Sequence, residues 1–456
     1  MYRMSKLYDE VSTKTKLNKK IAAWELIKSG NSDKLRELLN KREISNINAC
    51  VYRDGQMSAL LTTASKLGQL QCVNALLEHG ANKDILCGMV LDKSRILVSS
   101  VYLACFEGHI EVVKLLLEHG APLNSPTCAP LCGACRSGNT EIARFLIDQG
   151  ADVNLSSALN RYLCTSPLAA ASRCGIVELV EYLIDKGADI HCTGDQLNPL
   201  IEGCSNGHIE VMEVLLSHGA DINICTEDIL KTTCIYVACI NNSLEMVKFL
   251  LDRGADVTSL AFATAFNKRN IEVITLLLEH GADPDSVRIE TPLSPLMSAV
   301  TANDIPLMTL LLKYGGNVTS TIQTQNYNIH IKYIKTSSSL IIACEHGCID
   351  AVKLLLEHGA DVNQLFNNYH QNDTTLICLF RDRYWAPEPL HADCVNDEGY
   401  IDLTPNQLAC LKLLLEHGAD VTVLNSEGKT VFDYVKDRPG TTKLLNEYID
   451  TEPILK

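Results

Sequence analysis

One six-residue phrase recurs along this chain and limits its fold more than any other feature. Leu-Leu-Leu-Glu-His-Gly occupies residues 115–120 and returns at 276–281, 354–359 and 413–418. Less complete versions end at Gly80, Gly150, Gly187, Gly219, Gly254 and Gly315. Because 456 residues exceed what one globular core usually holds, and the spacing scatters around about 33 residues, the chain is predicted to stack repeated layers.

Each period contains the residues of two short helices. A capping residue followed by proline, as in Ser166-Pro167, starts the first helix, and a glycine such as Gly175 then breaks the chain. In the second helix apolar residues recur at offsets of three and four, as Ile110 and Val113 do. A second glycine ends this helix because it adopts the left-handed conformation without a side-chain clash. One period therefore predicts two antiparallel helices and a turn.

This pattern resembles the ankyrin-repeat family, with good matches in residues 129–154 and 198–223. The resemblance implies an all-α solenoid in which each layer holds a β-turn finger and two antiparallel helices. About twelve layers are expected over nearly the whole chain. They begin near residues 18, 57, 99, 129, 166, 198, 233, 260, 294, 338, 374 and 428.

The expected organisation is a basic N-terminal segment at 1–17, a solenoid at 18–450 and a tail at 451–456. Both end layers carry the polar residues that capping repeats need, so one complete solenoid without an appended domain is expected. Insertions lengthen three layers. They span 82–98, then 317–337 with the alternation of a β-hairpin, and about 381–405, which separates the two helices of one layer.

Composition narrows the class of partner. With 40 Lys and Arg against 55 Asp and Glu, the formal charge of −15 argues against direct binding of nucleic acid or of anionic membranes. No apolar run approaches the roughly 20 residues of a membrane helix, so no membrane insertion is expected. The chain is predicted to be a monomer in the cytoplasm, with the nucleus as the alternative compartment.

The 19 cysteines are predicted to be reduced and buried, because they lie inside apolar helical runs and their number is odd. Cys132 and Cys135 form a C-x-x-C pair, but Cys135 is equivalent to one cysteine in several other layers, so packing is preferred to a zinc site. His391, Asp393 and Cys394 are the other minor metal alternative. We expect no catalytic residue, no metal and no cofactor, and thus no enzyme.

Six histidines occupy the position before the helix-ending glycine. They are predicted to make local hydrogen bonds and to interact favourably with a helix C-terminus, since a catalytic histidine would not need six copies. They are His79, His119, His218, His280, His358 and His417.

The resemblance places a protein partner on the concave face and the finger tips, where a variable residue pair precedes the first glycine of each layer. The binding residues expected there, by number in this sequence, are Phe106, Glu107, Arg136, Arg173, Asn206, Ile240, Lys268, Glu345 and His346. We hypothesise that Phe106, Arg136 and Arg173 form an exposed aromatic and basic patch for an acidic or aromatic peptide. The alternative is ordinary solvated variation.

Two further features have a functional and a structural interpretation. Tyr384 and Trp385 would make the longest insertion a docking element, or the insertion is merely tolerated. Asn124, Asn154, Asn223 and Asn363 resemble finger asparagines that asparaginyl hydroxylases modify in this family, or they only stabilise the turn.

The sequence thus predicts a non-enzymatic scaffold or adaptor that binds other proteins. The alternative is a substrate-recognition subunit of a ubiquitin-ligase assembly, which would need a recruiting helical segment after the last layer, where Thr451–Lys456 remain. A third hypothesis is an enzyme that uses the 381–405 insertion with a metal.

Overall fold

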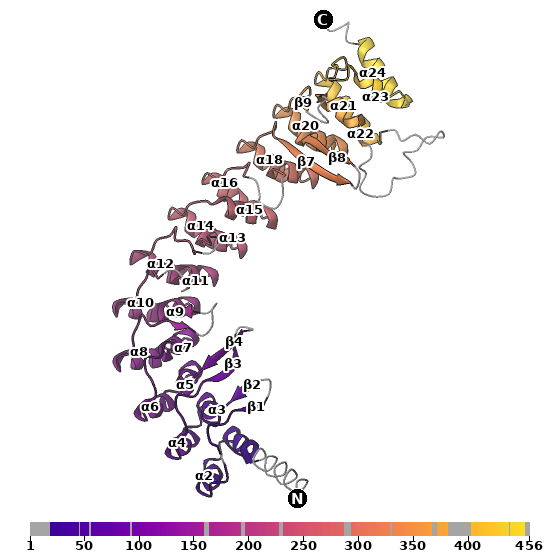
Figure 1. Ribbon diagram of the computed structural model, residues 1–456. Coiled ribbons are helices and arrows are strands. Elements are labelled where there is room, and N and C mark those ends of the chain that lie inside the picture. The colour runs from indigo at the N-terminus through magenta and orange to yellow at the C-terminus, as the bar shows by residue number, and fades with distance from the viewer. Residues whose placement is uncertain are drawn as a thin grey trace, which may run out of the picture. The chain divides into compact units, whose positions relative to one another are not determined.

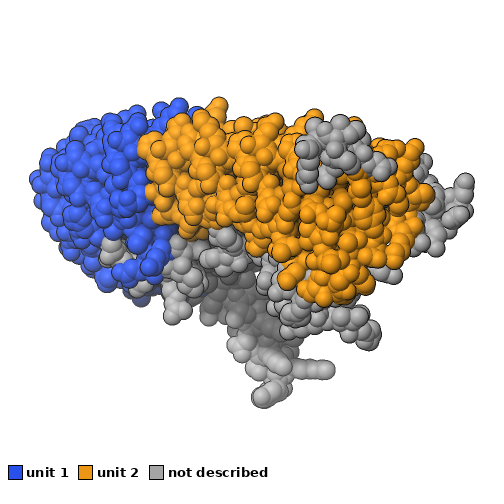
Figure 2. All heavy atoms as spheres, turned by 90° about the horizontal axis from the view of Figure 1, so that it is seen from above, with its two compact units in different colours: residues 1–256 blue, residues 257–456 orange. Residues whose placement is uncertain are grey.

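The computed structural model describes residues 19–44, 46–53, 56–91, 94–158, 164–192, 197–227, 231–286, 293–328, 331–366, 372–381, 403–436 and 438–451. The chain divides into two compact units, residues 1–256 and 257–456, which Figure 2 colours blue and orange. Each unit is described by itself.

Unit 1 is a succession of helix pairs joined by turns (Figure 1). The first pair is a helix through residues 19–28 and α2 (Ser32–Asn40). The others are α3 (Leu60–Lys66) with α4 (Leu70–Glu78), α5 (Ser100–Glu107) with α6 (Ile110–Glu118), α7 (Pro130–Ser137) with α8 (Thr140–Asp148), α9 (Pro167–Cys174) with α10 (Val177–Asp185), α11 (Pro199–Ser205) with α12 (Ile209–Ser217), and α13 (Cys234–Ile240) with α14 (Leu244–Asp252).

Unit 2 continues the same pairing. Its pairs are α15 (Ser259–Lys268) with α16 (Ile271–Glu279), α17 (Pro295–Thr301) with α18 (Ile305–Lys313), α19 (Ser339–Glu345) with α20 (Ile349–Glu357), α21 (Thr375–Arg381) with α22 (Pro405–Glu416), and α23 (Val431–Tyr434) with α24 (Pro439–Thr451). The described residues therefore form twelve pairs, and the prediction of an all-α solenoid of about twelve layers is confirmed.

The first helix of each pair, here called the inner helix, begins as the sequence predicts. The Ser166 hydroxyl accepts a hydrogen bond from the Ala169 amide at 3.2 Å, and Pro167 occupies the first turn of α9. The side-chain oxygen of Asn198 similarly accepts from the Leu200 amide at 2.9 Å. Within unit 1 the inner helices α3, α5, α7, α9, α11 and α13 pack on one another from layer to layer, and most of their residues are buried.

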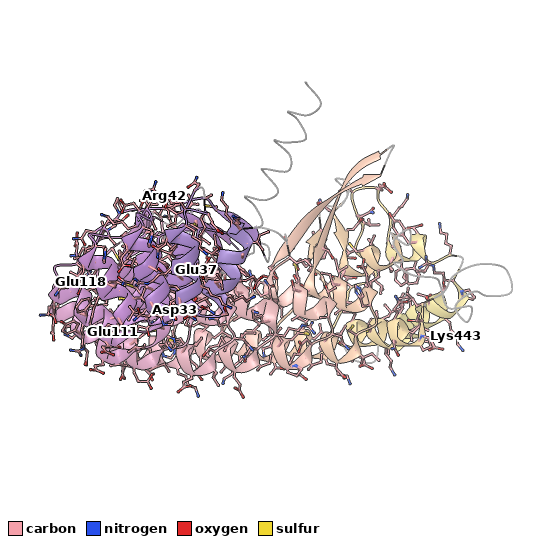
Figure 3. All side chains as sticks on the ribbon, turned by 90° about the horizontal axis from the view of Figure 1, so that it is seen from below. Asp33, Glu37, Arg42, Glu111, Glu118 and Lys443 are labelled. Atoms are coloured by element: carbon pink, nitrogen blue, oxygen red, sulfur yellow. The ribbon has the colours of Figure 1, made fainter. Side chains whose placement is uncertain are left out.

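The second, or outer, helix buries one stripe. In α6, Val112, Val113 and Leu116 are buried, whereas Glu111 and Glu118 are exposed and lie on the surface of unit 1 (Figure 3). Burial of this stripe between neighbouring helices stabilises a short helix that would be only marginally stable in isolation.

The six repeated histidines have the predicted structural role. Each donates a hydrogen bond from Nδ1 to the carbonyl four residues earlier, at the C-terminus of its own outer helix. The accepting carbonyls belong to Ala75, Leu115, Val214, Leu276, Leu354 and Leu413, at 2.7 to 2.9 Å. The glycine after each histidine is left-handed, as Gly120 is with φ of 78°.

The finger asparagines connect successive layers. The side chain of Asn154 donates to the Gly187 carbonyl at 3.0 Å and accepts from the Asp189 amide at 2.8 Å. Asn124 makes the equivalent pair of bonds to Gly150 and Asp152. In unit 2, Asn363 bridges in the same way to Gly418 and Asp420, and in unit 1 Asn223 accepts from Asp256. These contacts support the structural role that the sequence left open.

Several fingers are extended into strands. β1 (Val51–Arg53), β2 (Gln56–Ser58), β3 (Cys87–Leu91) and β4 (Ser94–Val98) form a four-stranded antiparallel sheet in that order, which the sequence did not predict. β7 (Thr321–Asn328) and β8 (Ile331–Ser338) form the hairpin predicted in 317–337. Shorter pairs are β5 (Ser157–Ala158) with β6 (Cys164–Thr165), and β9 (Leu365–Phe366) with β10 (Asp373–Thr374).

The 17 cysteines whose side chains the structure describes are free, which confirms the predicted reduced state for them. Most are buried; Cys50, Cys174 and Cys348 are half-buried, and Cys225 is exposed. Burial raises the pKa of the Cys105 and Cys135 thiols, because a thiolate would lose its hydration inside the stack.

Candidate functional site

The variable residues lie together at one end of the inner helices. In unit 1 they occupy the C-terminal ends of α3, α5, α7, α9, α11 and α13, on helices that pack side by side. We call this set the inner-helix row. It consists of Lys66 and Leu67, Phe106 and Glu107, Arg136 and Ser137, Arg173 and Cys174, Ser205 and Asn206, and Ile240 and Asn241.

Apolar side chains stand near both ends of this row. Leu67 is 41% exposed and Ile240 is 40% exposed, which is unusual for large aliphatic residues in this chain. Phe106 is half-buried, and its ring stacks on Tyr102 with 6.4 Å between centroids and 10° between planes. Glu107 and Asn206 are exposed, as predicted.

Arg136 contradicts the expectation of an exposed side chain, because it is only 9% exposed. Its neighbours explain the burial. The preceding turn of α7 holds Cys132 and Gly133, and a methyl group on Gly133 would meet the Tyr102 carbonyl at 3.0 Å. The inner helix α7 thus packs closely on α5, and the buried Arg136 side chain interacts electrostatically with Tyr102 and Glu202. The exposed patch in its predicted form is therefore wrong.

Glu202 on α11 is a site residue that sequence reasoning missed. Its carboxylate lies 4.0 Å from the Arg173 guanidinium, and its side chain is 13% exposed against 35% for Arg173. Burial raises the pKa of the Glu202 carboxyl even though the charges of Arg173 and Arg136 act in the opposite direction. The signal was available, since the equivalent positions hold Leu103 and Val237.

Tyr102 completes the surroundings of Arg136. The phenol is 1% exposed, and its hydroxyl has no hydrogen-bond partner within the described part of the chain. Burial raises the pKa of Tyr102, with Arg136 opposing the shift. Arg136, Arg173, Glu202, Tyr102 and Phe106 therefore come from four successive layers, and we call them the arginine cluster.

The predicted residues of unit 2 are more dispersed. Lys268 is exposed at the end of α15. Glu345 is half-buried at the end of α19, where its carbonyl accepts a hydrogen bond from Gln407 at 2.7 Å. His346 is exposed and donates from Nδ1 to the Ile342 carbonyl at 2.8 Å. Tyr384 and Trp385, together with His391, Asp393 and Cys394, lie outside the described residues.

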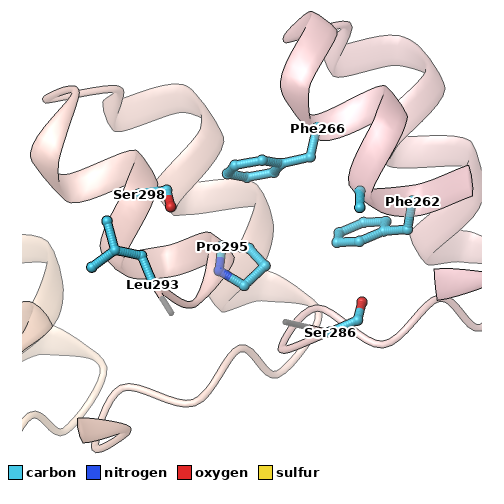
Figure 4. A pocket seen from close by; sticks show the side chains of 7 residues that line it. Phe262, Phe266, Ser286, Leu293, Pro295 and Ser298 are labelled. Atoms are coloured by element: carbon cyan, nitrogen blue, oxygen red, sulfur yellow. The ribbon is translucent and has the colours of Figure 1, made fainter. Parts of the chain in front are cut away.

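A small hollow in unit 2 was not foreseen from the sequence. Phe262 and Phe266 on α15 face Pro295 and Leu293 across it (Figure 4). It encloses about 220 Å³, part of which is open solvent. Phe266 occupies the position that holds Cys105, Cys204 and Cys344 elsewhere, so one bulky ring replaces a small residue there.

Within the described ranges, no group of three or more His, Cys, Asp or Glu side chains is arranged to hold a metal ion. Cys132 instead donates a hydrogen bond to the Leu155 carbonyl at 3.4 Å. No helix in those same ranges is long and apolar enough to cross a membrane.

Two curated relatives resemble part of the chain. The ankyrin repeat and SOCS box protein 6 of Homo sapiens is 32% identical over 121 residues, which are 26% of this chain and 21% of that protein. Its counterpart from Pongo abelii is 31% identical over 121 residues, with the same coverage. The chain thus matches only about a fifth of the length of these relatives.

The comparison with protein families covers a larger part of the chain than the two relatives do. The sequence profile described as ankyrin repeats in three copies matches residues 97–157, 167–261 and 260–366, which together exceed half of the chain. These segments contain the helix pairs α5 to α20, with four of the six repeated histidines and all four finger asparagines. The chain belongs to the ankyrin-repeat family, whose repeats bind other proteins and generally act as non-enzymatic interaction modules.

Proposed function

We propose that this chain is a non-enzymatic scaffold or adaptor that binds partner proteins through its inner-helix row and its finger tips. One observation carries the proposal. Framework positions repeat the same contacts layer after layer, such as the histidine bonds and the Asn154 bridge, while the inner-helix row presents a different pair of side chains in each layer. Such variation on a rigid framework is suited to selective recognition.

The proposal includes the extent and setting of the protein. The solenoid spans 18–450 with insertions at 82–98, 317–337 and 381–405, flanked by segments 1–17 and 451–456. The protein acts as a monomer in the cytoplasm or nucleus, without direct contact to nucleic acid, and Tyr384 and Trp385 add a second docking element. Finger asparagine hydroxylation remains a prediction, and peptide mass spectrometry that finds no added oxygen at Asn124, Asn154, Asn223 and Asn363 would remove it.

Affinity purification of the full-length protein, followed by calorimetric titration of the recovered partner, tests the main proposal. We expect saturable binding that is weakened by Ile240→Asp in the row and unchanged by Glu118→Gln on the outer helix α6, because only Ile240 lies on the proposed surface. Equal effects of the two substitutions would place the partner elsewhere. A parallel purification with residues 383–403 deleted separates the contribution of the longest insertion.

A second candidate function is a substrate-recognition subunit of a ubiquitin-ligase assembly. The observation in its favour is the partial match to an ankyrin repeat and SOCS box protein. If this candidate is right, ubiquitin-ligase subunits co-purify with the full-length chain, and the partner bound at the row becomes ubiquitinated in the reconstituted mixture. A bound partner without associated ligase subunits favours the simple adaptor.

A further inference from the structure

The arginine cluster differs in charge from the rest of the protein. The whole chain carries a formal charge of −15. The row and the cluster together hold three positive side chains, Lys66, Arg136 and Arg173. They hold two negative ones, Glu107 and Glu202, so one positive charge is in excess. An anionic partner is therefore repelled by most of the surface and attracted at this place.

The burial of the cluster strengthens that attraction. Arg136 is 9% exposed, and the Glu202 side chain beside Arg173 is 13% exposed. Charges interact more strongly where water is excluded, and Arg173 keeps enough exposure, at 35% of its side chain, to meet a second carboxylate. Burial also raises the pKa of Glu202, which is consistent with a site of low polarity.

The apolar residues of the row indicate which other side chains the partner needs and how long its bound segment is. Phe106 lies one layer before Arg136, and Ile240 lies two layers after Arg173. The distance from α5 to α13 is four layers, roughly 30–40 Å at about 8–10 Å each, which an extended peptide of roughly 10–12 residues spans.

We propose that the inner-helix row of unit 1 binds an extended peptide of a partner protein, with a carboxylate side chain at Arg173 and apolar side chains at Phe106 and Ile240. This inference rests on the proposed function, because it assigns a partner chemistry to the same surface. Phe106 and Ile240 act as apolar anchors, and Arg173 selects the acidic residue between them.

Selection from a random dodecapeptide phage library on immobilised full-length protein tests the inference. Three forms are compared: the native chain, Arg173→Gln, and the control Arg144→Gln. Arg144 is a matched control because its side chain is 40% exposed and pairs with Glu178 at 2.8 Å, but it belongs to the outer helix α8. Thermal melts of both variants verify that the fold is retained.

We expect acidic residues flanked by apolar ones to be enriched on the native chain and on Arg144→Gln, and the acidic preference to disappear on Arg173→Gln. For one selected peptide, Arg173→Gln should weaken binding at least about tenfold, and glutamine replacement of the peptide's carboxylates should do the same on the native chain and on Arg144→Gln but not on Arg173→Gln. Arg144→Gln should change the affinity less than about twofold.

The contradicting outcomes separate the two proposals. Enrichment of basic or purely apolar peptides, or an acidic preference that persists on Arg173→Gln, overturns the inference and leaves the adaptor function standing. A failure of all three forms to enrich any peptide contradicts both the inference and the proposed docking surface.

Discussion

At the scale of the residue, Glu202 departs from the apolar residues that equivalent positions hold in other layers. A carboxylate replaces the aliphatic residues found at Leu103 and Val237, and it is buried beside Arg173. Desolvation outweighs the attraction of two arginines, because the pKa of Glu202 is raised from its ordinary value of 4.5. The ion pair of Arg173 and Glu202 is therefore not expected to stabilise the fold.

Glu202→Gln should consequently stabilise the protein at neutral pH. Since the folded pKa is raised, the unfolded state loses its proton first, and the native carboxyl costs stability as pH rises from about 4.5 towards the folded pKa and above. The difference in melting temperature between variant and native protein should grow in favour of Glu202→Gln from pH 4 to pH 7. Glu178→Gln, whose side chain is 73% exposed, should show little of this trend. A native protein more stable than Glu202→Gln at pH 7 would contradict this account.

Asn154→Ala tests the framework at the same scale. It removes two hydrogen bonds between fingers, of 3.0 and 2.8 Å, so a loss of about 1–2 kcal/mol in the free energy of unfolding is expected. Asn74→Ala, which removes one exposed bond to Glu78 within a single helix, should change it by less than about 0.5 kcal/mol. Urea unfolding of both variants gives the comparison, and equal losses would mean that the bridge adds no stability.

Some of the residue-level site followed from the sequence and some did not. The histidine bonds and the inner-helix row could be predicted because repetition marks the framework and its absence marks the surface. The burial of Arg136 could not, since it depends on how neighbouring layers pack and not on the residues of α7 alone. Glu202 was overlooked because a single charged residue at an apolar position has no spacing pattern.

At the scale of the element, each layer depends on a sharp turn between its two helices. Gly175 ends α9 in the left-handed conformation with φ of 74°, and a methyl group there would lie 2.4 Å from the His208 ring. His208 is itself fixed, because its Nε2 donates to the Arg173 carbonyl at 3.0 Å. The turn after α9 in one layer thus positions the start of the outer helix α12 in the next layer. The sequence predicted this turn but not the histidine that packs on it.

Comparing Gly175→Ala with Gly187→Ala separates the effect of backbone strain from that of the contact with the His208 ring. Both glycines are left-handed, but the space beside Gly187 is open. Gly187→Ala should lose about 1–2 kcal/mol of unfolding free energy from backbone strain alone. Gly175→Ala should lose more, because the His208 ring must also move and its hydrogen bond is lost. Equal losses in denaturant titrations would argue against the contact between layers.

At the scale of the whole molecule, the described layers share one construction in both units, with buried small and aliphatic residues and free cysteines. This repetition explains why the fold could be predicted almost completely from the sequence. The finger sheet of β1 to β4 could not, because strand pairing between two fingers leaves no repeated signature. We propose that partner recognition depends on the residues that vary between layers.

Thiol labelling reports on this packing across the molecule. In the native protein a disulfide reagent should modify the exposed Cys225 quickly, whereas Cys105 and Cys135 should react only after unfolding, because they are fully buried and burial raises their pKa. Peptide mapping identifies the modified residues. Rapid labelling of Cys105 or Cys135 in the native protein would mean that packing between the layers does not exclude the reagent.

The central claim is that partners bind at the inner-helix row. Hydrogen exchange of the full-length protein, with and without a partner recovered by affinity purification, tests it most directly. The account predicts slower exchange on binding in residues 102–109, 133–139, 170–175 and 202–208, which contain the arginine cluster and the four central pairs of the row. Slower exchange confined to the outer helices α6, α8, α10 and α12, with the inner-helix row unchanged, would contradict it.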